Sequence, residues 1–123
     1  MTIESQSALV WAEILVTDLD AATAFYAAIT GRGLTRVQMG PNAVSIFEYG
    51  DGAVSANLME GTPAVGDGGT IVHLAAKGTI EDMMGRVTAA GGTVQGDPVS
   101  MPFGRYIYVS DPDGNTIGLF ERA

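Results

Sequence analysis

Cysteine is absent from the 123 residues of this chain, and long apolar runs are absent as well. The lack of cysteine excludes disulfide bonds, thiolate metal ligands and a cysteine nucleophile, and it fits a reducing cytoplasm as the expected location. No apolar run approaches the roughly 20 residues that a membrane-spanning helix needs, so we expect no membrane partner. The first seven residues are polar and carry Glu4 in place of a basic cluster, which argues against a secretory signal.

Basic side chains are few. Six Lys and Arg residues stand against 14 Asp and Glu residues, which gives a formal net charge of −8. A surface of this sign repels phosphate backbones, so we expect no nucleic-acid partner. The acidic residues are dispersed along the chain, so we interpret the charge as one that promotes solubility. Histidine occurs once, at His73, so a Ser-His-Asp triad has no support beyond chance co-occurrence.

The chain does contain 46% hydrophobic residues and 17 glycines, in a length that suits one domain over residues 1–123. The first half begins with an alternating strand at 10–17. Asp18 then favours the start of a helix over 20–30, which Gly31 would end. Three further extended segments follow, at residues 33–39, 43–49 and 53–60.

The second half repeats this order of elements. A strand at 70–76 precedes a helix at 80–90, whose start resembles a capping box formed by Thr79 and Asp82. Three extended segments follow, at residues 92–95, 105–110 and 116–121. We therefore predict an α+β fold of two βαβββ modules, although the pattern alone also suits a ferredoxin-like domain. The modules are expected at about 8–60 and about 70–121, with a linker at 61–69.

Three stretches carry a resemblance to a known family. They are WAEILVTDLDAATAFY at 11–26, IEDMMGRVTAAGGTV at 80–94 and SDPDGNTIGLFE at 110–121. Together, in this order, they resemble the vicinal-oxygen-chelate superfamily of glyoxalases, bleomycin-resistance proteins and dioxygenases, and most of all its lactoylglutathione-lyase-related branch. The resemblance implies two βαβββ modules that curl around a cavity, often with a divalent metal, and it implies a homodimer.

The resemblance also implies four metal-ligand positions, on the first and last strand of each module. In this sequence they fall on Trp11, Asn57, His73 and Gly118. Indole and glycine offer no ligand atom and the Asn amide is a weak ligand, so only His73 is a good one. Glu13 could add a carboxylate, but two ligands are too few to hold an ion firmly. We therefore expect no tightly bound divalent metal and no other cofactor.

The side on which His73 lies depends on the turn before the second helix. If this turn is one residue shorter than in the first half, His73 faces the cavity together with Ala75 and Lys77. Without the shortening, Val72 takes the cavity position and His73 faces the helix. We favour the first arrangement, because the second directs both His73 and Lys77 into the helix interface. The competing interpretation is that His73 is an ordinary half-buried strand residue.

The alternation of side chains along strands places mainly aromatic residues on the cavity face. The predicted face consists of Trp11, Glu13, Phe47, Tyr49, Asn57, His73, Tyr106, Tyr108 and Phe120. Phe103 and Arg105 are predicted at its rim. Aromatic walls with a few polar groups suit a planar or amphipathic small molecule, which is the partner we expect. The alternative is that these aromatic side chains only fill a core.

Two functions follow from such a cavity. The first is a metal-free lyase- or isomerase-like enzyme with Glu13 or His73 as general base. Tyr106 or Asn57 would then donate a hydrogen bond to an oxyanion. The second is a non-catalytic protein that sequesters an antibiotic or metabolite, as the bleomycin-resistance branch does. An acidic cavity with electron-rich walls would suit a cationic ligand. Glyoxalase I activity is least favoured, because its metal-bound water needs the missing ligands.

Overall fold

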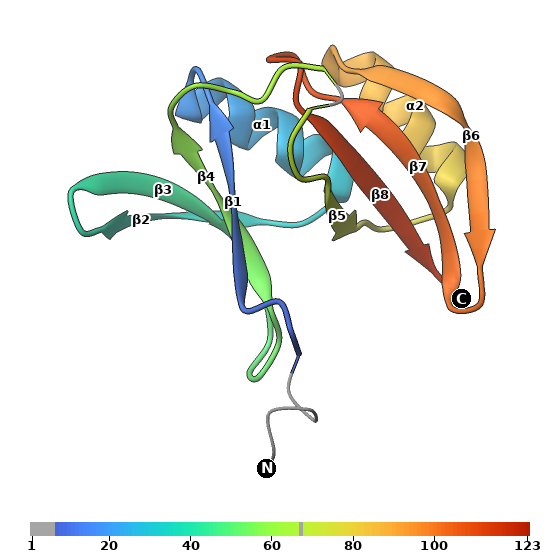
Figure 1. The fold of residues 1–123 in the computed structure, drawn as a ribbon, viewed down its shortest axis with the longest axis horizontal. Helices are drawn as coiled ribbons and strands as arrows, with labels where there is room; N and C mark the ends of the chain where they lie inside the picture. Colours follow the sequence, from blue (N-terminus) through green and yellow to red (C-terminus); the bar gives the residue numbers. More distant parts are fainter. Residues whose placement is uncertain (1–6, 67) are drawn as a thin grey trace.

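Two units with the same order of elements follow each other in the computed structural model, which describes residues 7–66 and 68–123 (Figure 1). The first unit consists of β1 (Trp11–Val16), α1 (Leu19–Thr30), β2 (Leu34–Met39), β3 (Asn42–Phe47) and β4 (Ser55–Glu60). The second consists of β5 (Val72–Ala75), α2 (Ile80–Ala90), β6 (Thr93–Met101), β7 (Gly104–Ser110) and β8 (Thr116–Arg122). The predicted α+β fold of two βαβββ modules is confirmed.

Each module forms its own four-stranded sheet, in the orders β1-β4-β3-β2 and β5-β8-β7-β6. The first and last strands of each module pair in parallel, and the other pairs are antiparallel. The two helices pack against each other, and the sheets diverge from them to either side (Figure 1). Each helix covers one face of its sheet and leaves the opposite face open. Neither described helix has the length and apolar character that a membrane span requires.

The hydrophobic core lies between the helices and the sheet faces that they cover. Its largest fully buried side chains include Tyr26, Ile29, Leu58, Ile80, Met83, Ile107, Ile117 and Leu119. Because side chains alternate along a strand, Ile107 and Val109 in this core direct Tyr106 and Tyr108 to the opposite, open face of the second sheet. Burial of one row of side chains in the core therefore determines that the alternate row lies on the open face of the sheet.

Both helices begin and end within one residue of the predicted positions. The Asp18 side chain accepts a hydrogen bond from the Ala21 amide at 3.0 Å, and Gly31 ends α1 with a left-handed φ of 69°. Thr79 and Asp82 form the reciprocal capping box of α2. These local signals act over three or four residues, which is why the sequence alone reveals them.

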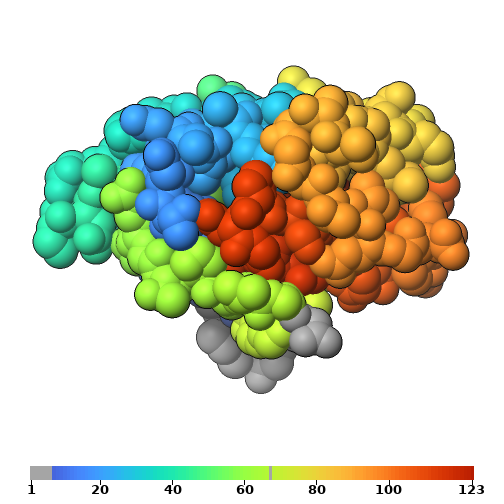
Figure 2. All heavy atoms as spheres, turned by 90° about the horizontal axis from the view of Figure 1, so that it is seen from above, coloured from blue at the N-terminus to red at the C-terminus, as the bar shows by residue number. Residues whose placement is uncertain are grey.

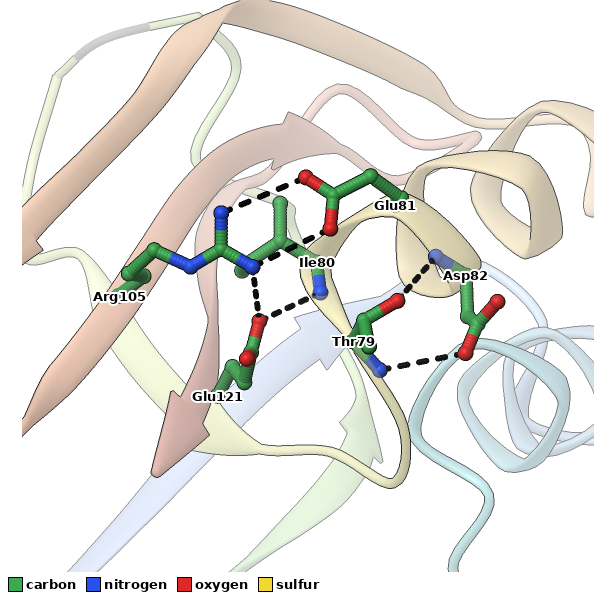
Figure 3. A network of polar contacts seen from close by, with 6 residues as sticks. All are labelled: Thr79, Ile80, Glu81, Asp82, Arg105 and Glu121. Atoms are coloured by element: carbon green, nitrogen blue, oxygen red, sulfur yellow. Dashed lines mark hydrogen bonds and ion pairs between the residues drawn. The ribbon is translucent and has the colours of Figure 1, made fainter. Parts of the chain in front are cut away.

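A glutamate on the last strand of each module supplies a second cap. Glu60 of β4 accepts the amide of Leu19 at 3.0 Å, and Glu121 of β8 accepts the amide of Ile80 at 2.8 Å (Figure 3). A carboxylate at a helix N-terminus satisfies an amide without a partner within the helix and complements the helix dipole. The same long-range contact occurs in both modules and ties each helix to its sheet.

The turn between β7 and β8, at residues 111–115, joins the two modules. Its Asp111 carboxylate accepts the hydroxyl of Tyr26 from α1 at 2.6 Å. The Asn115 amide donates to the carbonyl of Leu15 in β1 at 2.9 Å. In Figure 2 the orange-red atoms of this part of the chain lie beside blue atoms of the first module and beside the yellow-green linker. This turn therefore connects β7 to β8 and also holds the two modules together.

Strand β6 is longer than its predicted range of 92–95. It continues to Met101 through a shift of register between Gln95 and Val99. Gly96 enters this irregular segment with a φ of 70°, and Pro98 is tolerated because β6 is an edge strand. Gly96 and Pro98 thus lie at an irregularity within one longer strand.

Candidate functional site

His73 lies on the open face of the second sheet, in contact with two tyrosines. Its ring centroid is 4.9 Å from that of Tyr106 and 5.7 Å from that of Tyr108, both in edge-on contact. Leu74 is buried on the helix side of the same strand, so His73 is directed away from α2. The arrangement in which His73 faces the helix does not occur.

Gly118 lies directly beside the His73 ring on the neighbouring strand. The two residues are partners in the parallel β5–β8 pair. A Cβ atom on Gly118 would lie 2.6 Å from Cε1 and 2.8 Å from Cγ of the imidazole, well inside van der Waals contact. The imidazole therefore occupies the space that a side chain at position 118 would need, and its position depends on glycine there.

A cavity of about 440 Å³ opens beside His73. It is lined by His73, Ala75, Met101, Phe103, Tyr106, Phe120 and Arg122, all from the second module. Phe103, in the turn between β6 and β7, lies 5.8 Å from Phe120 between ring centroids. These aromatic walls and the single imidazole match the kind of cavity that accepts a small planar molecule.

The surroundings of this cavity favour a neutral His73 imidazole beside a protonated Tyr106 hydroxyl. Partial burial lowers the pKa of His73 below its ordinary value of 6.5, because desolvation disfavours the imidazolium. A hydrogen bond with Tyr108, and to a lesser extent burial, raises the pKa of Tyr106 above 10.0. At neutral pH the imidazole can accept a proton and the phenol can donate a hydrogen bond.

Trp11, Tyr49 and Asn57 form a separate group on the first sheet. The Trp11 indole donates to Oδ1 of Asn57 at 2.6 Å, and its ring lies edge-on to Tyr49 at 5.6 Å. Asn57 is fully buried, and its Nδ2 atom has no partner among the described residues. The structure does not bring these three residues into the cavity at His73.

The predicted position of Phe47 was wrong, whereas Glu13 lies on the open face as predicted but outside the cavity at His73. Phe47 is buried under α1, 5.9 Å from Tyr26 between ring centroids. The hydroxyl of Ser45, two residues earlier, contacts that of Thr23 in α1 at 2.7 Å, so the alternation of β3 is the reverse of the predicted one. Glu13 is exposed and lines a different depression, next to the linker between the modules.

Arg105 does not reach the cavity either. Its guanidinium pairs with Glu121 at 2.6 Å and with Glu81 at 3.1 Å, on the helix side of the second sheet (Figure 3). These pairs raise the pKa of the guanidinium further and lower that of Glu81. Arg105 therefore stabilises the start of α2, and the prediction that it lies at the rim was wrong.

The residues at the four positions implied for a metal do not fit a divalent ion. The amide oxygen of Asn57 is occupied by the Trp11 indole. Any ligand side chain at position 118 would collide with His73. Among the described residues no group of three His, Asp or Glu side chains is arranged to hold an ion. We therefore derive no chemical step through a metal.

Three basic residues surround a second cavity of about 450 Å³, and of these only Lys77 was predicted at a cavity, together with His73 and Ala75. Arg32, Lys77 and Arg122 line it, and it shares Ala75 and Arg122 with the cavity at His73. Arg122 could have been found, because it follows Phe120 by two residues and shares its strand face. Arg32 and Lys77 follow α1 and β5, and only the packing of the modules brings them together.

Comparisons with known proteins agree with this fold. A family model described as the Glyoxalase/Bleomycin resistance protein/Dioxygenase superfamily matches residues 8–119. A search of curated proteins found no significant match.

Among solved structures, a glyoxalase/bleomycin resistance protein from Streptomyces sp. CB03234 is 26% identical, with a TM-score of 0.66, over 93% of this chain and 100% of that one. A protein described in the same words from Albidiferax ferrireducens T118 is 24% identical, with a TM-score of 0.69, over 95% and 100%. The fosfomycin resistance protein FosX from Listeria monocytogenes is 20% identical, with a TM-score of 0.67, over 95% and 92%. Assignment to the lactoylglutathione-lyase-related branch stays a prediction.

Proposed function

Because the chain belongs to the glyoxalase/bleomycin resistance protein/dioxygenase superfamily, we propose that it acts on a small planar organic molecule in the cavity at His73. The proposed reaction is lyase- or isomerase-like, with His73 as general base. One observation carries this proposal: the imidazole, with its lowered pKa, lies against the hydroxyl-bearing ring of Tyr106 in an aromatic cavity.

Proton abstraction next to a carbonyl group is the step that these two side chains support. The imidazole takes the proton from the carbon, and the electron pair moves onto the carbonyl oxygen. The Tyr106 hydroxyl donates a hydrogen bond to the resulting oxyanion. Where a double bond is conjugated with the enolate, return of the proton to the γ carbon completes an isomerisation. Where the β carbon carries a leaving group, the enolate electron pair expels it as an anion, which the imidazolium can protonate, and this completes an elimination. Glu13, the other predicted base, lies outside this cavity.

Sequestration without catalysis is the second candidate function. It is favoured by the composition of the wall, in which three aromatic rings surround one base. A sequestering protein needs only stacking surfaces and shape, whereas a catalyst needs the imidazole as well.

The test begins with a thermal-shift screen of planar carbonyl compounds and antibiotics. A compound that binds is then incubated with the protein in deuterated water and examined by NMR. We expect deuterium in the compound or conversion to a product, and we expect His73→Gln to bind the compound but abolish both changes. Glu13→Gln serves as the matched control and should leave both unchanged. A compound that is recovered unchanged, without deuterium, would refute catalysis and support sequestration.

We further propose that the protein acts as a homodimer in the cytoplasm. Aromatic side chains are exposed in the segments that border the open sheet faces: Phe103, between β6 and β7, is 61% exposed, and Tyr49, between β3 and β4, is 51% exposed. A second copy that covers these faces would remove this surface from water. Sedimentation velocity should show a species of two chains, and a monomer at micromolar concentration would contradict the proposal.

A further inference from the structure

The second cavity gathers half of the basic side chains of a strongly acidic chain. Arg32, Lys77 and Arg122 line it, out of six Lys and Arg residues in a chain with a net charge of −8. The negative net charge of the chain repels anions over most of its surface. A local cluster of basic side chains is therefore an exception on this surface. Arg122 also lines the aromatic cavity at His73, so the two cavities adjoin.

Arg32 is fixed in place without losing its charge. Its Nε atom donates to the carbonyl of Ala75 at 2.8 Å, and a terminal nitrogen donates to the carbonyl of Glu48 at 3.1 Å. Both acceptors are neutral main-chain groups, one from each module. The guanidinium is therefore held in one orientation, and its charge is left to interact with a further group.

Lys77 and Arg122 complete the cluster. Within the described part of the chain, no ion pair involves Arg32, Lys77 or Arg122, whereas Arg36 is paired with Asp20. The stem of Lys77 packs over Gly31, which holds this side chain beside the cavity. Arg122 follows Phe120 on the open face of β8 and connects the basic cavity to the aromatic one.

Two carboxylates also line the basic cavity. Glu121 is already engaged by Arg105 and by the amide of Ile80. Glu48 is exposed, and its carboxylate lies over the backbone of Gly33. Three cations therefore face one carboxylate that is not engaged by another basic side chain, so the cavity as a whole is positive.

We propose that the basic cavity binds the anionic group of the ligand whose aromatic body occupies the cavity at His73. The ligand class is then an aromatic or planar organic anion, such as a carboxylate. This is opposite in charge to the cationic ligand that an acidic cavity would suit. The inference rests on the proposed function, since it uses the same aromatic cavity, and it adds the charge and the position of a second group.

Two fluorescent probes that differ by one charged group test this inference. 8-Anilinonaphthalene-1-sulfonate carries a sulfonate, and N-phenyl-1-naphthylamine has the same rings without it. Each is titrated into the whole protein at low ionic strength. We expect both probes to bind with a stoichiometry of one per chain. We expect the sulfonate probe to bind at least about fivefold more tightly, and added salt to weaken its binding only.

Charge-removing variants then locate the effect. Lys77→Gln should weaken binding of the sulfonate probe by about threefold to tenfold and leave the neutral probe unchanged, because Lys77 lines only the basic cavity. Arg122→Gln should weaken the sulfonate probe by a similar factor and the neutral probe less, because Arg122 lines both cavities. Glu48→Gln should strengthen binding of the sulfonate probe. Arg36→Gln removes the same charge far from the cavity and should change neither probe. Phe120→Leu should weaken both probes, because it alters the aromatic wall.

The outcomes separate the two proposals. If both probes bind with equal affinity, or if Lys77→Gln and Arg122→Gln act no differently from Arg36→Gln, the anionic subsite is refuted and the aromatic cavity stands. If neither probe binds, or if Phe120→Leu changes neither, the aromatic cavity itself is refuted.

Discussion

Removal of one hydroxyl should loosen the contact between the modules. The Tyr26 hydroxyl is fully buried and donates to the Asp111 carboxylate at 2.6 Å. The carboxylate holds this hydroxyl in its protonated form. Burial and the neighbouring Asp111 charge both raise the pKa of Tyr26 well above 10.0. In Tyr26→Phe the ring keeps its edge-on contacts with Phe25 and Phe47, and only the hydrogen bond is lost.

The loss of folding free energy expected for Tyr26→Phe depends on the charge of the acceptor, the Asp111 carboxylate. A hydrogen bond to a charged group contributes about 1.5–3 kcal/mol, and the Asp111 carboxylate keeps its other donors, the Asn115 side chain and two amides of its own turn. For a chain of 123 residues, the entropy of unfolding is about 0.26 kcal/mol/K, so the melting temperature should fall by about 6–12 °C.

Differential scanning calorimetry measures this change, and Tyr49→Phe is the matched control. The Tyr49 side chain is half exposed, so loss of its hydroxyl should cost less than about 0.5 kcal/mol. A double-mutant cycle of Tyr26→Phe with Asp111→Asn should give a coupling energy of about 1 kcal/mol or more. Equal shifts for Tyr26→Phe and Tyr49→Phe would refute the role assigned to this contact.

Three further predictions concern the cavity. The single histidine, followed by NMR, should titrate below 6.5. Because the folded state then binds fewer protons than the unfolded state, stability should fall as the pH falls from 6.5 through the lowered pKa of His73, and a titration at or above 6.5 would contradict this. Gly118→Ala should displace the imidazole and weaken binding of both naphthyl probes. Gly85→Ala, in open space on α2, should instead stabilise the fold by about 0.5–1 kcal/mol. Elemental analysis of protein purified without chelators should find far less than one divalent ion per chain, and near-stoichiometric Zn, Ni, Mn or Fe would contradict our interpretation of the four ligand positions.

The sequence by itself determined the elements and their repetition. Helix caps such as Asp18 and the Thr79–Asp82 box act between neighbours a few residues apart, so the sequence contains all that is needed to place them. The sequence also predicts which side chains of β7 and β8 face the helix, because Ile107 and Leu119 belong to strongly apolar rows. Local chemistry and side-chain periodicity therefore suffice for the modules and for the aromatic face of the second sheet.

Only the tertiary structure decided which of these residues share a site. Phe47 was misplaced because β3 carries Ser45 on the same covered face, where its hydroxyl contacts that of Thr23 in α1. Glu13 and His73 lie in different cavities, although both are on first strands of their modules. The basic cavity forms where the end of α1 meets the end of β5, a contact that depends on how two separate sheets and helices pack. Packing of this kind joins residues far apart in the chain, and no local pattern records it.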